Sequence, residues 1–428
     1  MIRPALILVT TRTYRAGAFL RAAERLGLPV TIATDHPLAW RTGPPTGLMA
    51  LDFDHPAEAA EALLNTPGPG FQAVLSAEDE GVIAAAAVSA RLHLTHNSPE
   101  AVAITRDKAR FRQRLDHAGL ELNPRFWILS LQADPEDAAA LVQYPCVLKP
   151  RGLAGSRGVI RANDPGEFVA AFRRTARIIQ SEAPQDPQDI HTTLLAESYL
   201  PGSEHALEGL LSDGRLELLA IFDKPDPLVG PFFEETLYVT PSRLEPALRQ
   251  AAQACVSRAV SSIGLTHGPV HAEVRVHEGR VWILEIAARS IGGLCSRALR
   301  FEGGRSLEEI LLLHAAGLPL PNLRLEPAAS GVMMIPIPGA GTLRSVEGVE
   351  DAAAVPGITE VVIELRPGEP AVPLPEGGAY LGFLFAEGES PAQVEGSLRS
   401  AHACLRIDLA PPADALELAE RRAFDLTP

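Results

Sequence analysis

The chain has 428 residues and a formal net charge of −15, from 38 basic and 53 acidic side chains. This length exceeds what one hydrophobic core usually supports, so we expect two or three subdomains. The acidic balance, with no run of lysine and arginine, argues against nucleic acid and anionic membranes as partners and favours small molecules. Four widely separated cysteines, no signal-peptide pattern and no bilayer-length apolar stretch predict a reduced, cytoplasmic protein.

The first part of the chain predicts an open parallel α/β domain. Apolar stretches at 5–11, 28–35 and 73–79 are typical of strands, and a stretch rich in Ala, Leu and Arg between the first two is typical of a helix. This strand, helix, strand order is the beginning of a parallel sheet. Ser98 followed by Pro99 predicts a helix N-terminus, and we expect one helix from there to Gly119, with a basic face that includes Lys108.

A glycine-rich loop follows the next predicted strand, "YPCVLKP" (144–150), which ends at Lys149. The loop contains Gly152, Gly155, Ser156 and Gly158, and another strand and a capped helix follow it. Glycines let a loop expose its backbone N–H groups to an anion, and a lysine supplies a point charge for a phosphate. The spacing is not that of a Walker A loop, and a flexible hairpin turn is the alternative.

The segment "AESYLPGSE" (196–204) places Glu197 at the end of an apolar strand and Glu204 after a Pro-Gly turn. A strand end leaves backbone groups free to bind the edge of a base, and a carboxylate can accept hydrogen bonds from two ribose hydroxyls. Taken alone, each glutamate also fits an ordinary surface position.

Two glutamates, Glu273 and Glu285, lie on two apolar strands joined by the turn Glu278–Gly279–Arg280. A three-residue loop would place the two acids directly opposite each other, whereas a two- or four-residue loop would place them on opposite faces. Opposed carboxylates repel unless a cation lies between them, and Mg²⁺ is the ion that these hard oxygen ligands suit. The alternative is that both acids face solvent at an edge. His271 would share the face of Glu273.

The order of Lys108, Lys149, "AESYLPGSE" and "HAEV…ILEIAAR" (271–289) resembles the ATP-grasp superfamily of carboxylate–amine and carboxylate–thiol ligases over roughly residues 1–320. Within it, the chain is most similar to the biotin-carboxylase-like branch that contains the L-amino-acid ligases. The resemblance implies an ATP-grasp fold of α/β and α+β class. Its expected parts are a Rossmann-like pre-ATP-grasp domain (1–95), a linker helix and lid subdomain (96–197), a catalytic core (198–324) and a C-terminal α+β subdomain (325–428).

The resemblance also implies roles for matching positions. Lys108 and Lys149 would contact the ATP phosphates, with Gly152, Gly155, Ser156 and Gly158 forming the lid over them. The adenine segment would be Glu197, Ser198, Tyr199 and Leu200, and Glu204 would bind the ribose. Glu273 and Glu285 would hold Mg²⁺ or Mn²⁺, Arg289 would face the γ-phosphate and the acyl phosphate, and Lys224 and Glu235 would lie on the phosphate or substrate side.

The implied activity is an ATP-dependent ligase that activates a small carboxylate, such as an amino acid, as an acyl phosphate and joins it to an amine. Two alternatives stay open: a biotin- or bicarbonate-using carboxylase, and a non-catalytic ATP-binding module. The second follows from Ala287, which stands where many ATP-grasp enzymes carry a metal-binding Asn. The expected partners are the carboxylate and the amine, without nucleic acid or membrane, and a homodimer is left open.

Other polar residues carry weaker signals. His93 with His96, and His267 with His271, have spacings that suit a metal only on a helix, and both stretches are predicted as strand or loop, which disfavours metal binding. Arg297 and Arg300 would either bind a substrate carboxylate or cap a helix end.

Overall fold

The computed structural model describes residues 3–11, 13–36, 47–64, 70–120, 123–183 and 189–411. The chain divides into two compact units, each made of three segments. Unit 1 contains residues 1–123, 205–221 and 244–327, and unit 2 contains residues 124–204, 222–243 and 328–428. The four-domain division expected from the sequence, with boundaries at 95, 197 and 324, stays a prediction.

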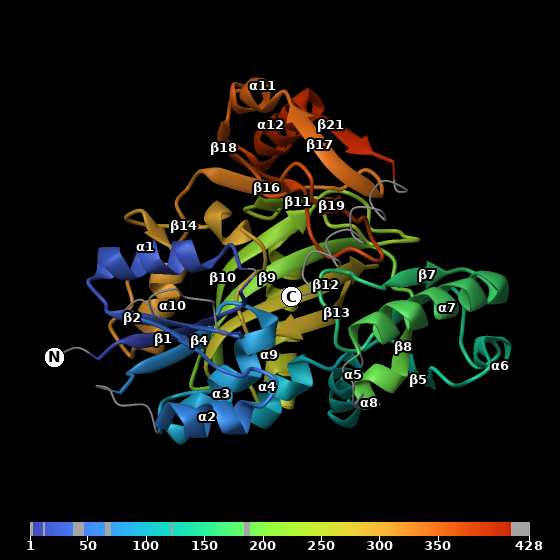
Figure 1. Cartoon of the computed structure of the whole chain (residues 1–428), viewed down its shortest axis with the longest axis horizontal. Helices are drawn as coiled ribbons and strands as arrows, with labels where there is room; N and C mark the ends of the chain where they lie inside the picture. The colour runs from blue at the N-terminus through green and yellow to red at the C-terminus, as the bar shows by residue number, and fades with distance from the viewer. Residues whose placement is uncertain are drawn as a thin grey trace, which may run out of the picture. The chain divides into compact units, whose positions relative to one another are not determined.

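Unit 1 begins with a parallel sheet of order β3-β2-β1-β4, as the sequence predicted. Its central strand "ALILV" is completely buried, which suits a strand covered on both faces. Helix α1 packs beside α10 and helix α2 beside α3 (Figure 1). The elements are β1 (Ala5–Val9), α1 (Ala16–Leu26), β2 (Val30–Thr34), β3 (Leu48–Ala50), α2 (Pro56–Leu64), β4 (Ala73–Ser76), the 3₁₀ turn η1 (Asp79–Gly81) and α3 (Val82–Arg91).

The single helix expected between Pro99 and Gly119 is wrong, because the chain forms two helices there. Ser98 caps α4 (Pro99–Thr105) as predicted, and α5 (Lys108–His117) then begins anew. Asp107 causes the break: its backbone is extended, and its side chain accepts hydrogen bonds from the N–H groups of Ala109 and Arg110. The break makes Lys108 the first residue of a helix.

Unit 1 also contains antiparallel strands in the order β13-β12-β9-β10, and helix α9 packs on β12 and β13. The turn between β9 and β10 is Asp213-Gly214, both with positive φ, as is typical of an Asp-Gly hairpin turn. The elements are β9 (Ser203–Ser212), β10 (Arg215–Lys224), α9 (Pro246–Ile263), β12 (Gly268–His277), β13 (Arg280–Ala287), η2 (Cys295–Ala298), β14 (Arg300–Phe301), β15 (Arg305–Ser306) and α10 (Leu307–Ala315), with β9 beginning and β10 ending in unit 2. A capping box of Ser306 and Glu309 opens α10.

Unit 2 begins with a four-stranded antiparallel sheet of order β5-β8-β6-β7, the small α+β structure that the sequence predicted around the glycine loop. Asp164 caps α7, which packs on β6 and β7 through a core that includes Phe168 and Phe172 (Figure 1). The elements are β5 (Phe126–Ser130), α6 (Pro135–Ala139), β6 (Cys146–Pro150), β7 (Ile160–Ala162), α7 (Pro165–Glu182), α8 (Asp189–Thr192) and β8 (Thr193–Ser198).

The rest of unit 2 is a second α+β layer in which strands β11-β16-β20-β18 carry helices α11 and α12. The Ser390 side chain caps α12. The elements are β11 (Leu237–Thr240), β16 (Ala329–Ile335), β17 (Gly341–Glu347), α11 (Val349–Ala353), β18 (Ile358–Ile363), β19 (Pro370–Ala371), β20 (Gly382–Gly388), α12 (Pro391–Cys404) and β21 (Arg406–Ala410). None of the helices described in either unit combines the length and the apolar character needed to cross a bilayer.

Candidate active site

The hairpin β12–β13 brings Glu273 directly opposite Glu285, as expected, but by a different route. The predicted three-residue loop is wrong: His277 pairs with Arg280, so the turn is the two residues Glu278-Gly279, both with positive φ. Such a turn alone would separate the acids onto opposite faces. A β-bulge just before Glu285 leaves Leu284 without a partner across the ladder. This bulge shifts the register back by one residue.

The donor set of this hairpin fits a hard divalent cation. The two carboxylates face each other on adjacent strands, with side chains 21% and 37% exposed, so solvent and a ligand can reach them. Lys108 Nζ lies 3.3 Å from Glu285 Oε1 and partly compensates the negative charge. Mg²⁺ and Mn²⁺ prefer carboxylate oxygens as ligands, and two carboxylates leave coordination positions on the ion open.

His271 lies beside this pair, as its position two residues before Glu273 predicted. Its Nε2 is 3.7 Å from Glu273 Oε1, and its Nδ1 is 2.6 Å from Oε1 of the buried Glu208. Burial lowers the pKa of His271, but hydrogen bonds to Glu208 and Glu273 outweigh it and raise the pKa to about 9. His271 also pairs across the ladder with Ala287, the position that lacks the metal-binding Asn of many relatives.

Arg289 is held in an ion-pair cluster at the carboxyl end of β4. Its Nη2 donates to Asp79 Oδ2 at 2.6 Å, and Arg106 Nη1 lies 3.1 Å from Asp79 Oδ1. Burial raises the pKa of Asp79, but the two guanidinium groups outweigh it and hold the pKa well below its usual range. The buried Arg15 donates to the Ser290 hydroxyl at 2.8 Å and to the Ala77 carbonyl. The cluster is therefore rich in guanidinium donors, which suits an anionic ligand.

Lys149 and the glycine loop lie together in unit 2. Lys149 Nζ is 2.6 Å from Glu197 Oε2, across the β6–β8 pair. Gly155, Ser156 and Gly158 all have positive φ, a backbone region that only glycine adopts freely. A Cβ at Gly158 would lie 2.6 Å from the Pro150 ring, so this position requires glycine, whereas Gly152 does not have a positive φ.

A segment of the C-terminal region, residues 375–378, packs against the downstream half of the glycine loop. The Gly158 N–H donates to the Pro375 carbonyl at 2.8 Å, and Arg157 Nε donates to the Glu376 carbonyl at 3.2 Å. The Glu376 carboxylate also accepts two hydrogen bonds from Arg174 of α7, at 2.7 and 2.8 Å. The end of the loop is thus tied both to α7 and to the C-terminal region.

Lys224 joins Glu204 and Glu235 in a buried triad within unit 2. Its ammonium is 2.7 Å from Glu204 Oε1, contacts Glu235 Oε1, and lies 4.9 Å from the centre of the Tyr238 ring. The Lys224 side chain is only 2% exposed, so it depends on its carboxylate partners. The resemblance assigned Lys224 and Glu235 to the phosphate or substrate side and Glu204 to the ribose, and the structure brings the three residues together.

The predicted adenine segment comprises the last two residues of β8, Glu197 and Ser198, and the two residues that follow. The N–H groups of Ser198 and Tyr199 donate to the carbonyls of Arg125 and Pro145, both at 2.9 Å, which fixes the backbone of the segment. The Tyr199 ring lies under the Arg161 guanidinium at 4.0 Å and near Phe233. Because both N–H groups are engaged, a base would meet other groups of the segment, which includes Leu200.

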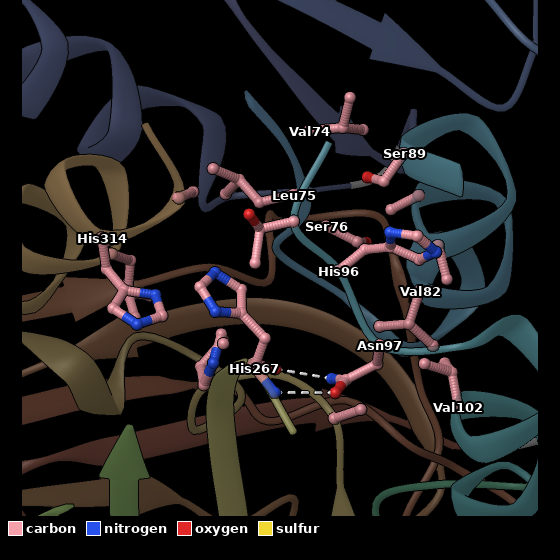
Figure 2. Close-up of a pocket in the computed structure, with 18 residues that line it drawn as sticks. Val74, Leu75, Ser76, Val82, Ser89, His96, Asn97, Val102, His267 and His314 are labelled. Atoms are coloured by element: carbon pink, nitrogen blue, oxygen red, sulfur yellow. Dashed lines mark hydrogen bonds between the residues drawn. The ribbon is translucent and has the colours of Figure 1, made fainter. Parts of the chain in front are cut away.

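A separate cavity of about 80 Å³ lies in unit 1, lined by β4, α3, α10 and the start of β12. His267 and His314 stack there with ring centres 4.2 Å apart, and burial lowers the pKa of His314 to about 4. The Asn97 side chain bonds to the backbone of His267 (Figure 2). His96 lines the cavity, whereas His93 is not among its lining residues.

Several residues of the site escaped the sequence analysis. Asp79, Arg106, Arg112 and Glu208 are buried or half-buried charged residues that contact predicted site residues or their strand. A usable signal existed for Glu208, because it is a lone charge within the apolar strand "HALEGLL". For Asp79 and Arg106 the partners are far apart in sequence, so no local pattern pointed to them.

The comparisons with known families agree with this geometry. Residues 142–298 match the ATP-grasp domain family, and residues 333–410 match the L-amino acid ligase C-terminal domain 2 family. Residues 142–298 of the chain are an ATP-grasp domain. The fold class expected from the sequence is confirmed, as is the similarity to L-amino acid ligases.

Individual relatives of this ATP-grasp protein are distant. An alanine–anticapsin ligase of Bacillus subtilis is 27% identical over 56% of the chain and 53% of the relative. Carnosine synthase 1 of Gallus gallus is 29% identical over 66% of the chain and 32% of the relative. The alignments therefore span about half or less of these curated relatives. The crystal structure of an L-amino acid ligase from Bacillus licheniformis superposes with a TM-score of 0.81 at 25% identity, over 96% of this chain and 100% of that one.

Proposed function

We propose that this ATP-grasp protein is an ADP-forming ligase that joins a small carboxylate, in particular an amino acid, to an amine. The observation that carries the proposal is the pair Glu273–Glu285, held face to face with Lys108 beside it. A match to an L-amino acid ligase C-terminal domain, and relatives named alanine–anticapsin ligase and carnosine synthase, support amino acids as substrates.

The reaction has two steps. A carboxylate oxygen of the first substrate attacks the γ-phosphorus of ATP, and the bond from that phosphorus to the β-phosphate oxygen breaks. The products of this step are ADP and an acyl phosphate. The nitrogen of the second substrate then attacks the acyl carbon, the carbon–oxygen bond to phosphate breaks, and the amine loses a proton as the amide forms. Mg²⁺ held by Glu273 and Glu285 would offset charge on the phosphate oxygens.

Residues of unit 1 supply the fixed charges for this chemistry. Arg289 would donate to the transferring phosphoryl group and to the acyl phosphate, and Asp79 and the Ser290 carbonyl orient its guanidinium. Lys108, at the first turn of α5, would reach a phosphate oxygen once a metal ion shares the charge of Glu285. Ala287 offers no ligand atom, so the two glutamates, water and ATP itself would complete the coordination.

Residues of unit 2 would bind the nucleotide. Lys149 and the loop Gly152, Gly155, Ser156, Gly158 would hold the phosphates, since the lysine supplies a positive charge and glycines let a backbone approach an anion closely. Glu197, Ser198, Tyr199 and Leu200 would line the base, and Glu204 the ribose. Lys224, which pairs with both Glu204 and Glu235, would then determine the net charge beside the ribose. Closing such a loop before chemistry would keep water from the acyl phosphate.

Two alternatives are disfavoured by specific observations. A non-catalytic nucleotide-binding module would rest on Ala287 alone, whereas Glu273, Glu285, Lys108 and Arg289 are all retained. The match of residues 333–410 to an L-amino acid ligase C-terminal domain argues against a biotin- or bicarbonate-using carboxylase.

A coupled assay of ADP release tests the proposal. The protein is incubated with Mg·ATP and a panel of amino acids, singly and in pairs, with bicarbonate plus biotin in parallel. We expect amino-acid-dependent ADP and phosphate in equal amounts, together with a dipeptide detectable by mass spectrometry, and none with a Glu273→Gln/Glu285→Gln double variant. Release that depends on bicarbonate and biotin, or none with any acid and amine, would reject the proposal.

A further inference from the structure

We propose that Arg112 is a positioning residue that holds the β-bulge at Leu284 and thereby sets the two metal carboxylates face to face. The inference rests on the proposed function, and it assigns Arg112 a role in metal affinity that no signal in the sequence suggested. Arg112 acts through the backbone of β13 and does not itself touch the carboxylates.

The bulge decides whether the metal pair exists. The two-residue turn fixes the pairs His277–Arg280 and Val274–Ile283. Continued without a bulge, this ladder would place Leu284 opposite Glu273 and would turn Glu285 to the other face of the hairpin, since side chains alternate along a strand. With Leu284 as the extra residue, Glu285 returns to the face of Glu273.

A bulge leaves backbone groups without ladder partners, and Arg112 supplies donors for them. Its Nη1 donates to the Ile283 carbonyl at 3.0 Å, and its Nη2 donates to the Leu284 carbonyl at 2.6 Å. The Arg112 residue is 1% exposed, so its guanidinium is kept in the protein interior by these and its other hydrogen bonds. The two carbonyls belong to the extra residue and to the residue just before it.

Helix α5 links this support to the phosphate side of the site. Lys108 and Arg112 are one turn apart on the helix and therefore lie on the same face. Lys108 reaches the side chain of Glu285, while Arg112 reaches the carbonyl of the residue before it. Asn123 closes the arrangement, because its side chain accepts from Arg112 Nη1 at 3.2 Å and donates to the Arg112 carbonyl at 3.0 Å.

Arginine suits this place better than lysine. The planar guanidinium presents several donors at fixed angles and can bond two successive carbonyls at once, whereas an ammonium is a single point donor. Arg112→Lys should therefore keep the charge but support the bulge less well, and Arg112→Gln should lose both the charge and the fork. Outer partners that orient metal ligands typically change metal affinity about 10- to 100-fold when removed.

The test measures Mn²⁺ binding in the presence of ADP by electron paramagnetic resonance, together with the Mg²⁺ dependence of ADP release. We expect Arg112→Gln to weaken Mn²⁺ binding about 10- to 100-fold, with Arg112→Lys in between. Turnover should recover at high Mg²⁺, because the ligands are present but poorly placed. Arg114→Lys is the matched control, since Arg114 lies on the same helix and also donates to a backbone carbonyl, that of Ser262 at 2.9 Å, but is exposed and away from the hairpin.

The outcomes separate this inference from the proposed function. If wild-type protein neither binds Mn²⁺ with ADP nor releases ADP, the proposed function fails. If wild type does both, and Arg112→Lys and Arg112→Gln match Arg114→Lys in Mn²⁺ affinity, the role of Arg112 is refuted. If Arg112→Gln does not fold, the Mn²⁺ affinity of Arg112→Lys decides, provided that its Tm equals that of the wild type. A crystal structure of Arg112→Lys with an unchanged bulge and weakened metal binding would also overturn the mechanism.

Discussion

Replacing Asp79 with asparagine should destabilise unit 1 markedly. Asp79 is the shared partner of Arg289 and Arg106, at 2.6 and 3.1 Å, and all three side chains are largely buried. Removing one partner of a buried ion pair costs about 3–5 kcal/mol, because the charges left behind lose their compensation. Arg106 is the more exposed of the two arginines, so we expect the lower end, about 3 kcal/mol.

The destabilisation is measurable as a change in Tm. For a folding unit of roughly 220 residues, about 3 kcal/mol corresponds to a fall in Tm of about 6–12 °C. Differential scanning calorimetry at pH 7 would compare Asp79→Asn with Asp52→Asn. Asp52 is an exposed aspartate of the same unit whose carboxylate lies 2.8 Å from His55 Nδ1, and its replacement should change Tm by no more than about 2 °C.

The pH dependence gives a second, independent check on Asp79. Its pKa is lower in the folded protein than in the unfolded chain, so its stabilisation is complete above the unfolded value of about 4. The stabilisation is lost only as the pH falls from there through the folded value. The difference in Tm between wild type and Asp79→Asn should therefore stay constant from pH 7 to about 4 and shrink below it. A difference under about 1 kcal/mol at pH 7, or one that widens on acidification, would refute the reasoning.

Three further substitutions test other parts of the protein. Glu285→Gln should lower ADP release at least about 100-fold with an unchanged Tm, since a neutral amide is a poor ligand for a hard cation; activity within a few-fold of wild type would rule out the metal assignment. Lys224→Met should cost about 3–5 kcal/mol in urea unfolding, because two carboxylates lose their cation, and a double variant with Glu235→Gln should recover part of it; full additivity would argue against the triad. Glu376→Ala should change Tm by no more than about 2 °C but speed hydrogen exchange at 152–159; equal exchange in Glu376→Ala and the control Glu136→Ala would show that the contact does not hold the loop.

Local patterns along the chain predicted most of the elements around the site. The buried run "ALILV" and the cap Ser98 each act within a few residues of sequence. Where two local signals competed, the prediction failed: Asp107 ends a helix that the surrounding pattern continues, because its side chain binds two N–H groups of the next turn.

The hairpin shows why a site can be predicted for an incomplete reason. The expected three-residue loop gave the right partner for Glu285 but the wrong turn. The true register depends on a bulge at Leu284, whose carbonyl accepts a hydrogen bond from Arg112, 172 residues away in sequence. No periodicity in β13 marks Leu284 as the extra residue. Likewise, Asp79 and Arg289 are 210 residues apart, and only the folded chain brings them together.

The contact between residues 375–378 and the glycine loop limits how this protein can be recombined. Arg157 lies in the glycine loop and Arg174 on α7, whereas Glu376 and the Pro375 carbonyl belong to the C-terminal region. A chimera that takes its C-terminal region from another ligase would leave Arg174 without its carboxylate acceptor unless that ligase carries an equivalent glutamate. These regions should therefore be exchanged as one block, and substrate range altered through the C-terminal region should bring changes in nucleotide affinity with it.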